Sequence, residues 1–213
     1  GAMAWLDAVE EYVPESVSVA GFLDSNYYQD LAPYPLSEFE GFQTETKIIT
    51  MEMNGTALLS IASPTCAAGF DPDDVWRCHY GVHRMPFIEL PYLMTHAQYD
   101  GWQLSHDVHD YEGIESDPVY TDDEMFYVNR FGAMSSAWLR TLPSEMNSPQ
   151  SSIYSTGCYN HHISEKSGFY STTTSNNVTE AMALGVFIDQ VRAGKVGQSW
   201  FDDCVGYECG LGC

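Results

Sequence analysis

Hydrophobic and polar positions along the chain recur with two different periods. Four segments place apolar residues three or four positions apart, which is the spacing of an amphipathic helix. Three shorter segments are rich in apolar or β-branched residues and are bounded by turn-forming residues, which is typical of buried strands. The expected helices are residues 4–13, 44–53, 124–142 and 177–191, and the expected strands are residues 17–22, 90–97 and 152–155. Because strands and helices alternate, the pattern predicts an α/β fold with a mostly parallel sheet flanked by helices.

Two polar segments between these elements are expected to be surface loops. Residues 33–42 contain two prolines and Gly41, which interrupt both helices and strands. Residues 107–124 carry eight carboxylates and almost no aliphatic side chains, so we expect a solvated loop there. The 213 residues contain no internal repeat and no low-complexity linker, and they suffice for one large domain or two small ones.

Composition excludes several classes of protein. An apolar fraction of 44% with only 18% charged residues is that of a globular protein, so disorder of the whole chain is excluded. The formal net charge of −22 repels phosphate backbones and anionic lipids, which argues against nucleic-acid and membrane-surface partners. The sequence has no run of about 18 apolar residues, so no membrane span is expected. Acidity alone does not identify a substrate, because it also fits solubility in a salty medium.

The cysteines favour disulfide bonds over a zinc site. They stand at positions 66, 78, 158, 204, 209 and 213. Zinc sites usually contain Cys-x-x-Cys pairs or nearby histidines, and the C-terminal group of three cysteines has neither. Disulfides persist in oxidising compartments, so we expect a secreted protein. Two N-glycosylation sequons, at Asn54 and Asn177, agree with a secreted glycoprotein.

Two short blocks carry the candidate catalytic chemistry. Asp100 follows the expected strand at 90–97, so it is either a functional carboxylate at a strand tip or an ordinary turn residue before glycine. His161 follows the expected strand at 152–155 and is either a general base or a plain loop histidine. The Asp-then-His order, with a separation of 61 residues, matches the last two members of an α/β-hydrolase triad. In such a triad the carboxylate accepts the Nδ1–H of the imidazole, and Nε2 takes a proton from a serine.

A third block offers a metal-binding alternative. His106 and His109 lie three residues apart beside Asp107 and Asp110, a spacing that brings two imidazoles together on one helical turn. The block belongs to the acidic segment, and no further ligand is evident nearby. We therefore expect neither a metal nor another cofactor.

No serine in the sequence completes a triad. A Gly-x-Ser-x-Gly elbow is absent, and so is a glycine-rich stretch that would donate an oxyanion hole. Ser135 and Ser136 fall inside an expected helix, Ser155 falls shortly before Cys158, and Ser60 lacks the small neighbours of a strained elbow. The candidate acid and base thus lack a nucleophile.

Several blocks, in this order along the chain, are similar to those of one known family. The blocks are Trp5–Val9, Val17–Tyr28, Cys66–Cys78, Tyr99–Gln103, Cys158–His161 and the cysteine-rich tail from Asp203. Together they resemble the pectin acetylesterase family, which includes the Notum-type carboxylesterases. Members of this family are secreted serine esterases with the α/β-hydrolase fold. Their blocks read Tyr-Asp-Ser-Trp-Gln and Cys-x-x-His where this chain has Tyr99–Gln103 and Cys158–His161.

The resemblance assigns roles to individual residues. Asp100 corresponds to the triad acid and His161 to the base, with His162 as the alternative base if the loop is shifted by one residue. Cys66 and Cys78 correspond to the ends of a short disulfide-bonded loop. The other four cysteines allow three pairings, and a link from Cys158 to the tail is the one we expect.

The resemblance also implies a part that lies outside this sequence. The family's Gly-x-Ser-Ala-Gly-Gly elbow and its oxyanion segment lie N-terminal to the matched blocks. Residues 4–213 are therefore expected to form the C-terminal part of one α/β-hydrolase domain, after a Gly-Ala-Met remnant of an expression tag at residues 1–3. The serine would be supplied by an N-terminal segment or a separate chain of the same precursor. Without that segment, one side of the sheet and much apolar surface would be exposed.

Two functions remain open at this point. In the first, the chain supplies the acid and base of a secreted carboxylic-ester hydrolase that deacetylates an acidic polysaccharide or removes a lipid acyl group from a protein. In the second, it is a non-catalytic, acidic interaction protein derived from the hydrolase fold, which would fit the missing serine and the net charge of −22.

Overall fold

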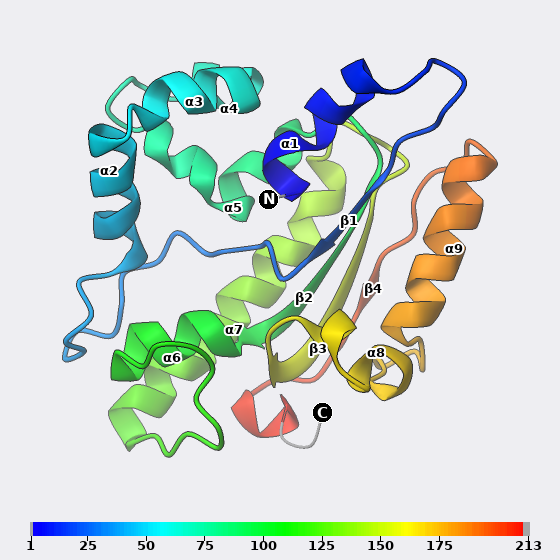
Figure 1. Cartoon of the computed structure of the whole chain (residues 1–213). Coiled ribbons are helices and arrows are strands. Elements are labelled where there is room, and N and C mark those ends of the chain that lie inside the picture. Colours follow the sequence, from blue (N-terminus) through cyan, green and yellow to red (C-terminus); the bar gives the residue numbers. More distant parts are fainter. Residues whose placement is uncertain (1, 211–213) are drawn as a thin grey trace.

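The computed structural model describes residues 2–210 and shows a parallel sheet with helices on both faces (Figure 1). Within that range the sheet has four strands in the order β1–β2–β3–β4, and every neighbouring pair is parallel. The strands are β1 (Gly21–Asp24), β2 (Tyr92–Asp100), β3 (Ser152–Asn160) and β4 (Trp200–Phe201). The helices are α1 (Ala2–Val9), α2 (Phe42–Glu52), α3 (Gly55–Ala62), α4 (Pro64–Ala68), α5 (Gly81–Arg84), α6 (Gly101–His109), α7 (Asp122–Thr141), α8 (Gly168–Ser171) and α9 (Glu180–Arg192). The predicted α/β class is confirmed.

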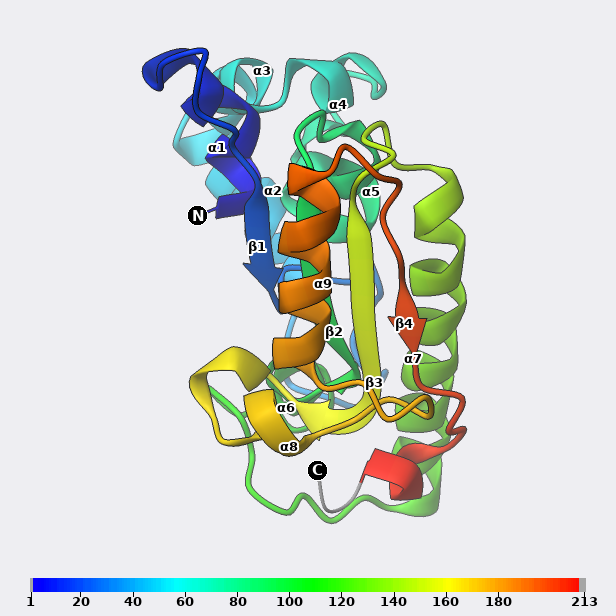
Figure 2. The same cartoon turned by 90° about the vertical axis from the view of Figure 1, so that its right-hand side faces the viewer.

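Strand β2 is buried along its whole length because helices cover both of its faces. Alternate side chains of a strand point to opposite faces of the sheet. Accordingly, Met94 packs with Leu139 of α7 on one face, and Leu93 packs with Phe187 of α9 on the other. Figure 2 shows α9 across the face of the sheet that points to the viewer, with α7 behind β4. Burial on both faces favours consecutive apolar residues, which is the pattern that predicted a strand at residues 90–97. The strand runs three residues further, to Asp100, and it also buries polar side chains such as Thr95 and His96.

A cluster of short helices, α2 to α5, connects β1 to β2 and lies on the same side of the sheet as α1 (Figure 1). The disulfide Cys66–Cys78 crosses this cluster and confirms the predicted pairing. The buried Arg84 donates from Nη2 to the carbonyl oxygens of Ala4 at 2.9 Å and Ala62 at 2.5 Å. These bonds satisfy a charge that would be costly to bury alone, and they tie α1 to the cluster.

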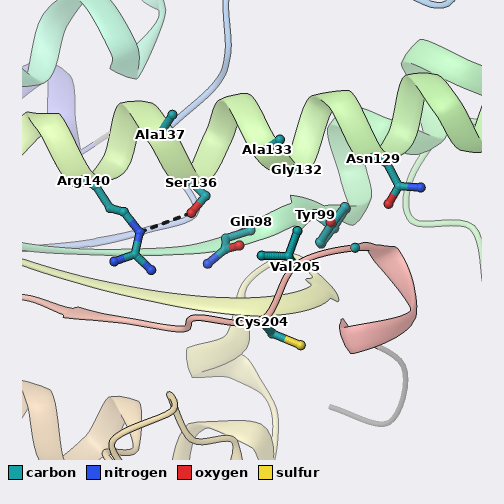
Figure 3. Close-up of a pocket in the computed structure, with 11 residues that line it drawn as sticks. Gln98, Tyr99, Asn129, Gly132, Ala133, Ser136, Ala137, Arg140, Cys204 and Val205 are labelled. Carbon is teal, nitrogen blue, oxygen red and sulfur yellow. Dashed lines mark hydrogen bonds between the residues drawn. The ribbon is translucent and has the colours of Figure 1, made fainter.

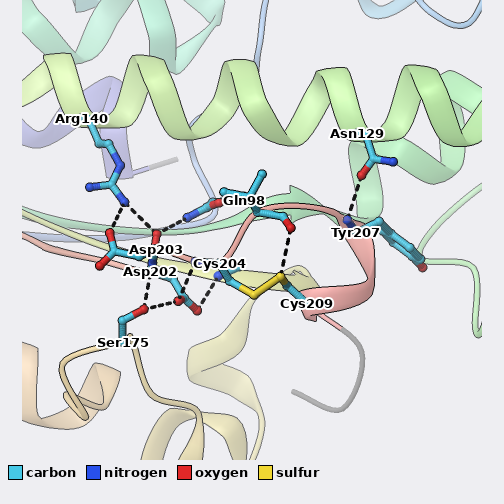
Figure 4. The surroundings of a disulfide bond; sticks show 11 residues. Gln98, Asn129, Arg140, Ser175, Asp202, Asp203, Cys204, Tyr207 and Cys209 are labelled. Atoms are coloured by element: carbon cyan, nitrogen blue, oxygen red, sulfur yellow. Dashed lines mark hydrogen bonds and ion pairs between the residues drawn. A yellow bond between two sulfur atoms is a disulfide. The ribbon is translucent and has the colours of Figure 1, made fainter.

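The C-terminal tail continues from β4 and is fastened to α7. Arg140 of α7 donates to the carbonyl oxygen of Asp202 at 2.8 Å and forms an ion pair with Asp203 at 2.9 Å (Figure 4). The disulfide Cys204–Cys209 closes the next turn of the tail. A cavity of about 490 Å³ remains between the tail, α7 and β2 (Figure 3). Cys158 is also disulfide-bonded. Cys213 lies outside the described residues, so the expected link from Cys158 to the tail stays a prediction.

The predicted helices agree better with the structure than the predicted strands do. The expected helices at 44–53, 124–142 and 177–191 correspond to α2, α7 and α9 within a few residues. Helix α7 begins with a capping box, in which the side chains of Thr121 and Glu124 each accept a backbone N–H from the other. No helix in the described part of the chain is both long and apolar enough to cross a membrane.

The expected strand at residues 17–22 is wrong in its bounds, because β1 occupies Gly21–Asp24. Pairing begins where the N–H of Gly21 donates to the carbonyl oxygen of Pro91 at 2.8 Å, directly before the first residue of β2. Residues 17–20 precede this point and therefore have no strand beside them. The β-branched composition of that segment could not show where its partner begins.

The expected solvated loop at residues 107–124 is wrong at both ends, because α6 runs to His109 and α7 begins at Asp122. Asp107 is fully buried within α6, and the hydroxyl of Tyr127 donates to its Oδ2 at 3.2 Å. Burial raises the pKa of Asp107 to about 8, so this carboxyl is mostly protonated at neutral pH. Carboxylates are rarely buried, and nothing local distinguishes this one from its solvated neighbours.

Candidate active site

The two blocks that carry the candidate chemistry meet at the C-terminal edge of the sheet. Asp100 is the last residue of β2, and its register partner Asn160 is the last residue of β3. The register of the two strands shifts by one residue shortly before this edge, and without the shift Asp100 would lie opposite Tyr159. A shift of this kind is a β-bulge, which re-aims the side chains that follow it. It brings His161, the next residue of the chain, beside the carboxylate of Asp100.

Asp100 uses its two carboxylate oxygens for two different purposes. Its Oδ2 accepts a hydrogen bond from Nδ1 of His161 at 2.7 Å. Its Oδ1 accepts from the backbone N–H of Gln103 at 2.9 Å, which caps the first turn of α6. Because the carboxylate accepts from Nδ1, the proton of the neutral imidazole lies on Nδ1 and Nε2 is left as an acceptor. No serine among the described residues donates to Nε2.

The electrostatics of the pair keep the carboxyl ionised. Burial alone would raise the pKa of Asp100, but the hydrogen bond and charge of His161, the nearby His96 and the N–H of Gln103 together lower it. The ring of His96 is buried, with its Nδ1 3.9 Å from Oδ2 of Asp100. Burial lowers the pKa of His96 to about 4, so this second imidazole is neutral at physiological pH. The arrangement therefore presents one carboxylate paired with one imidazole.

Aromatic rings flank the imidazole of His161. Trp102 stacks beside it with ring centroids 6.0 Å apart and planes at 27°, and Tyr28 lies 6.3 Å away at 51°. Both rings also border an adjoining pocket of about 290 Å³. The pocket is lined by Tyr28, Phe42, Thr46, His79, Tyr80 and Trp102. A concave, mostly apolar surface next to a polar reactive pair is typical of a small-ligand site.

His162, the alternative base, does not contact Asp100. Its ring packs on that of His161 with a centroid distance of 4.0 Å, and its Nδ1 lies 3.9 Å from Glu165. The structure therefore brings His161, and not His162, to the carboxylate.

The metal hypothesis for His106 and His109 finds no support. The Nδ1 of His106 forms a hydrogen bond with the carbonyl oxygen of Trp102 at 2.8 Å, whereas that of His109 bonds to Glu115 at 2.5 Å. Within residues 2–210, no three or more His, Cys, Asp or Glu side chains are grouped so as to hold a metal ion. The two histidines are occupied by separate structural contacts.

A family model for pectinacetylesterases matches residues 1–210. The chain belongs to the pectinacetylesterase family. This confirms the resemblance that was inferred from the order of the sequence blocks. None of the curated proteins compared with the chain is a match.

Solved structures related to this pectinacetylesterase-family chain show the same fold. Two crystal forms of the Wnt deacylase Notum from Drosophila match it with TM-scores of 0.75 and 0.72, at 18% and 17% sequence identity. The matches cover 100% of this chain but 55% and 56% of the Notum chains. The chain thus spans about half the length of these structures.

Some residues that hold the candidate pair in place were not predicted from the sequence. The Oδ1 of Asn160 accepts from the backbone N–H of His161 at 2.8 Å and from Nζ of Lys166 at 2.5 Å. Asn160 occupies a variable position of the Cys-x-x-His block, so the motif gives no signal for it. Asp24 is the last residue of β1 and Ser25 comes directly after it, at the same edge of the sheet. A position at a strand tip is also the signal that had identified Asp100.

Proposed function

We propose that this chain supplies the acid and base of a serine carboxylic-ester hydrolase. The observation that carries the proposal is the hydrogen bond between Asp100 and Nδ1 of His161, which leaves Nε2 free of described partners. This is the arrangement by which a carboxylate orients an imidazole to act as a general base. Membership of the pectinacetylesterase family supports the choice of an ester as the substrate.

The proposed reaction follows from the orientation of the imidazole. Nε2 of His161 removes the proton of a serine hydroxyl while the serine Oγ forms a bond to the acyl carbonyl carbon. Asp100 stabilises the imidazolium that results. The tetrahedral intermediate collapses as the ester C–O bond breaks, and Nε2 returns the proton to the departing alcohol. A water molecule, activated in the same way, then releases the acid from the acyl-serine.

The serine and the oxyanion donors are proposed to come from an N-terminal segment or chain of the same precursor. Residues 4–213 would then be the C-terminal part of one α/β-hydrolase domain. In the described residues β1 pairs with β2 alone, so its other edge is free to accept a strand. Large apolar side chains of the neighbouring α1 region are exposed as well, with exposed fractions of 48% for Trp5 and 84% for Tyr12. An added strand and its connections would cover this surface.

The proposed substrate is an acyl ester of a polysaccharide, with acetyl as the acyl group. The pocket beside Trp102 and Tyr28 is apolar and limited to about 290 Å³, which suits an acyl group better than a sugar chain. The solved Notum structures are of a Wnt deacylase, so a longer acyl group on a protein is the natural second substrate to test.

Secretion and glycosylation belong to the same proposal. The Cys66–Cys78 and Cys204–Cys209 disulfides fit an oxidising compartment. Asn54 and Asn177, the acceptors of the two sequons, are both exposed, and both have a left-handed backbone in a turn. Mass spectrometry of the secreted precursor before and after endoglycosidase treatment tests occupancy at both positions.

The test is ester hydrolysis by the full-length precursor and by its variants. Asp100→Asn and His161→Ala should each lower kcat on an acetylated polysaccharide by about a thousandfold to ten-thousandfold. His162→Ala is the matched control, because the neighbouring ring packs on His161 but does not contact Asp100. It should retain most of the activity.

A precursor that contains an intact serine but hydrolyses neither acetyl nor longer acyl esters would refute the proposal. The acidic interaction protein would then be favoured, and His161→Ala should leave its partner binding unchanged. Loss of activity in both histidine variants would instead point to a general distortion of the loop.

A further inference from the structure

The residues that follow His161 are fastened to the tip of β1, a strand that is not adjacent to β3. Oδ2 of Asp24 accepts from the backbone N–H of Ser164 at 3.1 Å and also from its hydroxyl. The Oγ of Ser25 accepts from the backbone N–H of His162 at 2.9 Å. The loop after the candidate base is thus held at two points by consecutive residues of one strand end.

The two attachments are linked to each other and to β2. The Ser25 hydroxyl that accepts from His162 donates in turn to Oδ1 of Asp24 at 3.0 Å. The hydroxyl of Thr95, on β2, donates to the same oxygen at 3.3 Å. One carboxylate therefore joins β1, β2 and the loop at residues 162–164. Charge-assisted hydrogen bonds of this kind are stronger than neutral ones.

The backbone of this loop has a strained conformation that depends on contacts with its surroundings. Ser25 has a φ of 58° and His162 a φ of 53°, both in the left-handed region that non-glycine residues seldom occupy. This conformation is strained for a residue that has a side chain, and it persists only where the surroundings enforce it. The bond between Ser25 and His162 joins these two residues directly, so loss of the bond would allow both to relax.

We propose that Asp24 and Ser25 act as positioning residues for His161, by clamping the backbone of residues 162–164 against the end of β1. The proposal deepens the proposed function and rests on it. His161 stands between two restraints: Asn160 accepts its own backbone N–H, and the clamp holds the next residue. With its backbone fixed on both sides, the imidazole keeps Nδ1 on Asp100 and Nε2 toward the place of the reacting hydroxyl.

The clamp can be tested with Ser25→Ala and Ser164→Ala, each of which removes one hydroxyl from it. Ser164→Thr retains the hydroxyl and is the rescue variant, and Ser60→Ala, at an exposed serine of α3, is the matched control. In the precursor, Ser25→Ala and Ser164→Ala should lower kcat about tenfold to a hundredfold with little change in KM, because small displacements of a catalytic group cost rate rather than binding. The rescue and control variants should remain close to the unmodified protein.

A second measurement does not depend on catalysis. In NMR spectra of residues 1–213, the Nδ1–H proton of His161 should be protected by its bond to Asp100. Ser25→Ala and Ser164→Ala should broaden this signal through exchange with water. If hydrogen exchange shows that Ser25→Ala releases the backbone N–H of His162 while the His161 signal and kcat stay unchanged, the clamp is refuted. If the unmodified precursor is inactive, the proposed function fails, and the His161 signal alone decides whether the clamp holds the ring.

Discussion

Gly132 in the middle of α7 provides a direct test of the packing next to the site. At Gly132 the helix faces the ring of Tyr99, which is the residue before Asp100 in the sequence (Figure 3). A Cβ atom on Gly132 would lie 2.2 Å from Cε1 and 2.3 Å from Cζ of the Tyr99 ring. Real Cβ atoms do not approach other heavy atoms so closely, so Gly132→Ala requires the ring or the helix to move.

Two effects of opposite sign determine how Gly132→Ala changes the free energy of unfolding. Alanine favours a helix over glycine by about 1 kcal/mol. Overpacking of a buried site costs about 1 to 3 kcal/mol, and occasionally more. The Tyr99 ring is 2% exposed and is held edge-on against Tyr207 at 5.7 Å, so it cannot yield without losing that contact. A 2.2 Å approach to a buried ring puts the packing cost in the upper part of its range, at about 2 to 3 kcal/mol. We therefore expect Gly132→Ala to lower the free energy of unfolding by about 1 to 2 kcal/mol after the helix gain is subtracted.

The matched control is Gly185→Ala, at an exposed glycine inside α9. A Cβ at Gly185 would meet no atom within 4 Å, so only the gain in helix propensity remains. This variant should be stabilised by about 0.5 to 1 kcal/mol. Urea unfolding followed by circular dichroism measures both changes, and thermal unfolding should show shifts of about 2–4 °C per kcal/mol for a chain of this size.

A double variant tests whether the Tyr99 ring is the cause. Tyr99→Leu removes the ring, so Gly132→Ala should cost less in that background than in the native sequence. If Gly132→Ala proves as stable as the native chain, or if its cost is the same with and without the ring, the packing argument is wrong. If Gly185→Ala is not stabilising, the estimate of helix propensity is wrong instead.

Two further predictions concern buried groups away from the reacting atoms. Glu180 is fully buried, and burial followed by the charge of Asp24 raises its pKa from 4.5 to about 7. The folded chain then keeps a proton that the unfolded chain has lost, so the free energy of unfolding should fall by about 3 kcal/mol between about pH 4.5 and 7. Glu180→Gln should flatten this decline in urea titrations at several pH values, and an unchanged slope would contradict the assignment. Cys66→Ala with Cys78→Ala opens a loop with a sequence separation of 12 and should cost about 3 kcal/mol of unfolding free energy, whereas an unchanged urea midpoint would exclude a stabilising role for this disulfide.

The helices and strands that were predicted well are those whose own residues carry the features that define them. Helix α7 carries a capping box at Thr121, a regular apolar stripe and a terminal Pro143, and its bounds were predicted within two residues. Strand β2 begins with the apolar residues Tyr92 to Met94, as burial on both faces favours, although it also buries Thr95, His96 and Gln98. Strand β1 was misplaced because its first residue depends on where β2 begins, and a neighbour about 70 positions away leaves no mark on residues 17–24.

In the candidate site, too, some features are predicted by the sequence and others depend on contacts between distant elements. Asp100 and His161 come shortly after the expected strands at residues 90–97 and 152–155, which end three and five residues short of β2 and β3. Their meeting was still predicted, because parallel strands bring their C-terminal ends to one edge. The register shift that places them within hydrogen-bonding distance is a property of the pair of strands and not of either one. The clamp from Asp24 to Ser164 joins residues 140 positions apart through side chains that are common in loops. Such a contact becomes visible only once the sheet order is known.

The double role of Asp100 determines which substitution can separate chemistry from folding. Its Oδ1 caps α6 and its Oδ2 holds His161, so Asp100→Ala would remove a helix cap and the partner of the imidazole together. Loss of a cap costs about 1 kcal/mol, and the activity lost could then reflect unfolding. Asparagine caps helices as well as aspartate does, because its carbonyl oxygen still accepts the N–H of Gln103. Its amide group, however, would face Nδ1 with a donor and favour the tautomer that carries the proton on Nε2, where it cannot accept one. A variant that keeps its stability but loses the His161 Nδ1–H signal would therefore assign the effect to the imidazole alone.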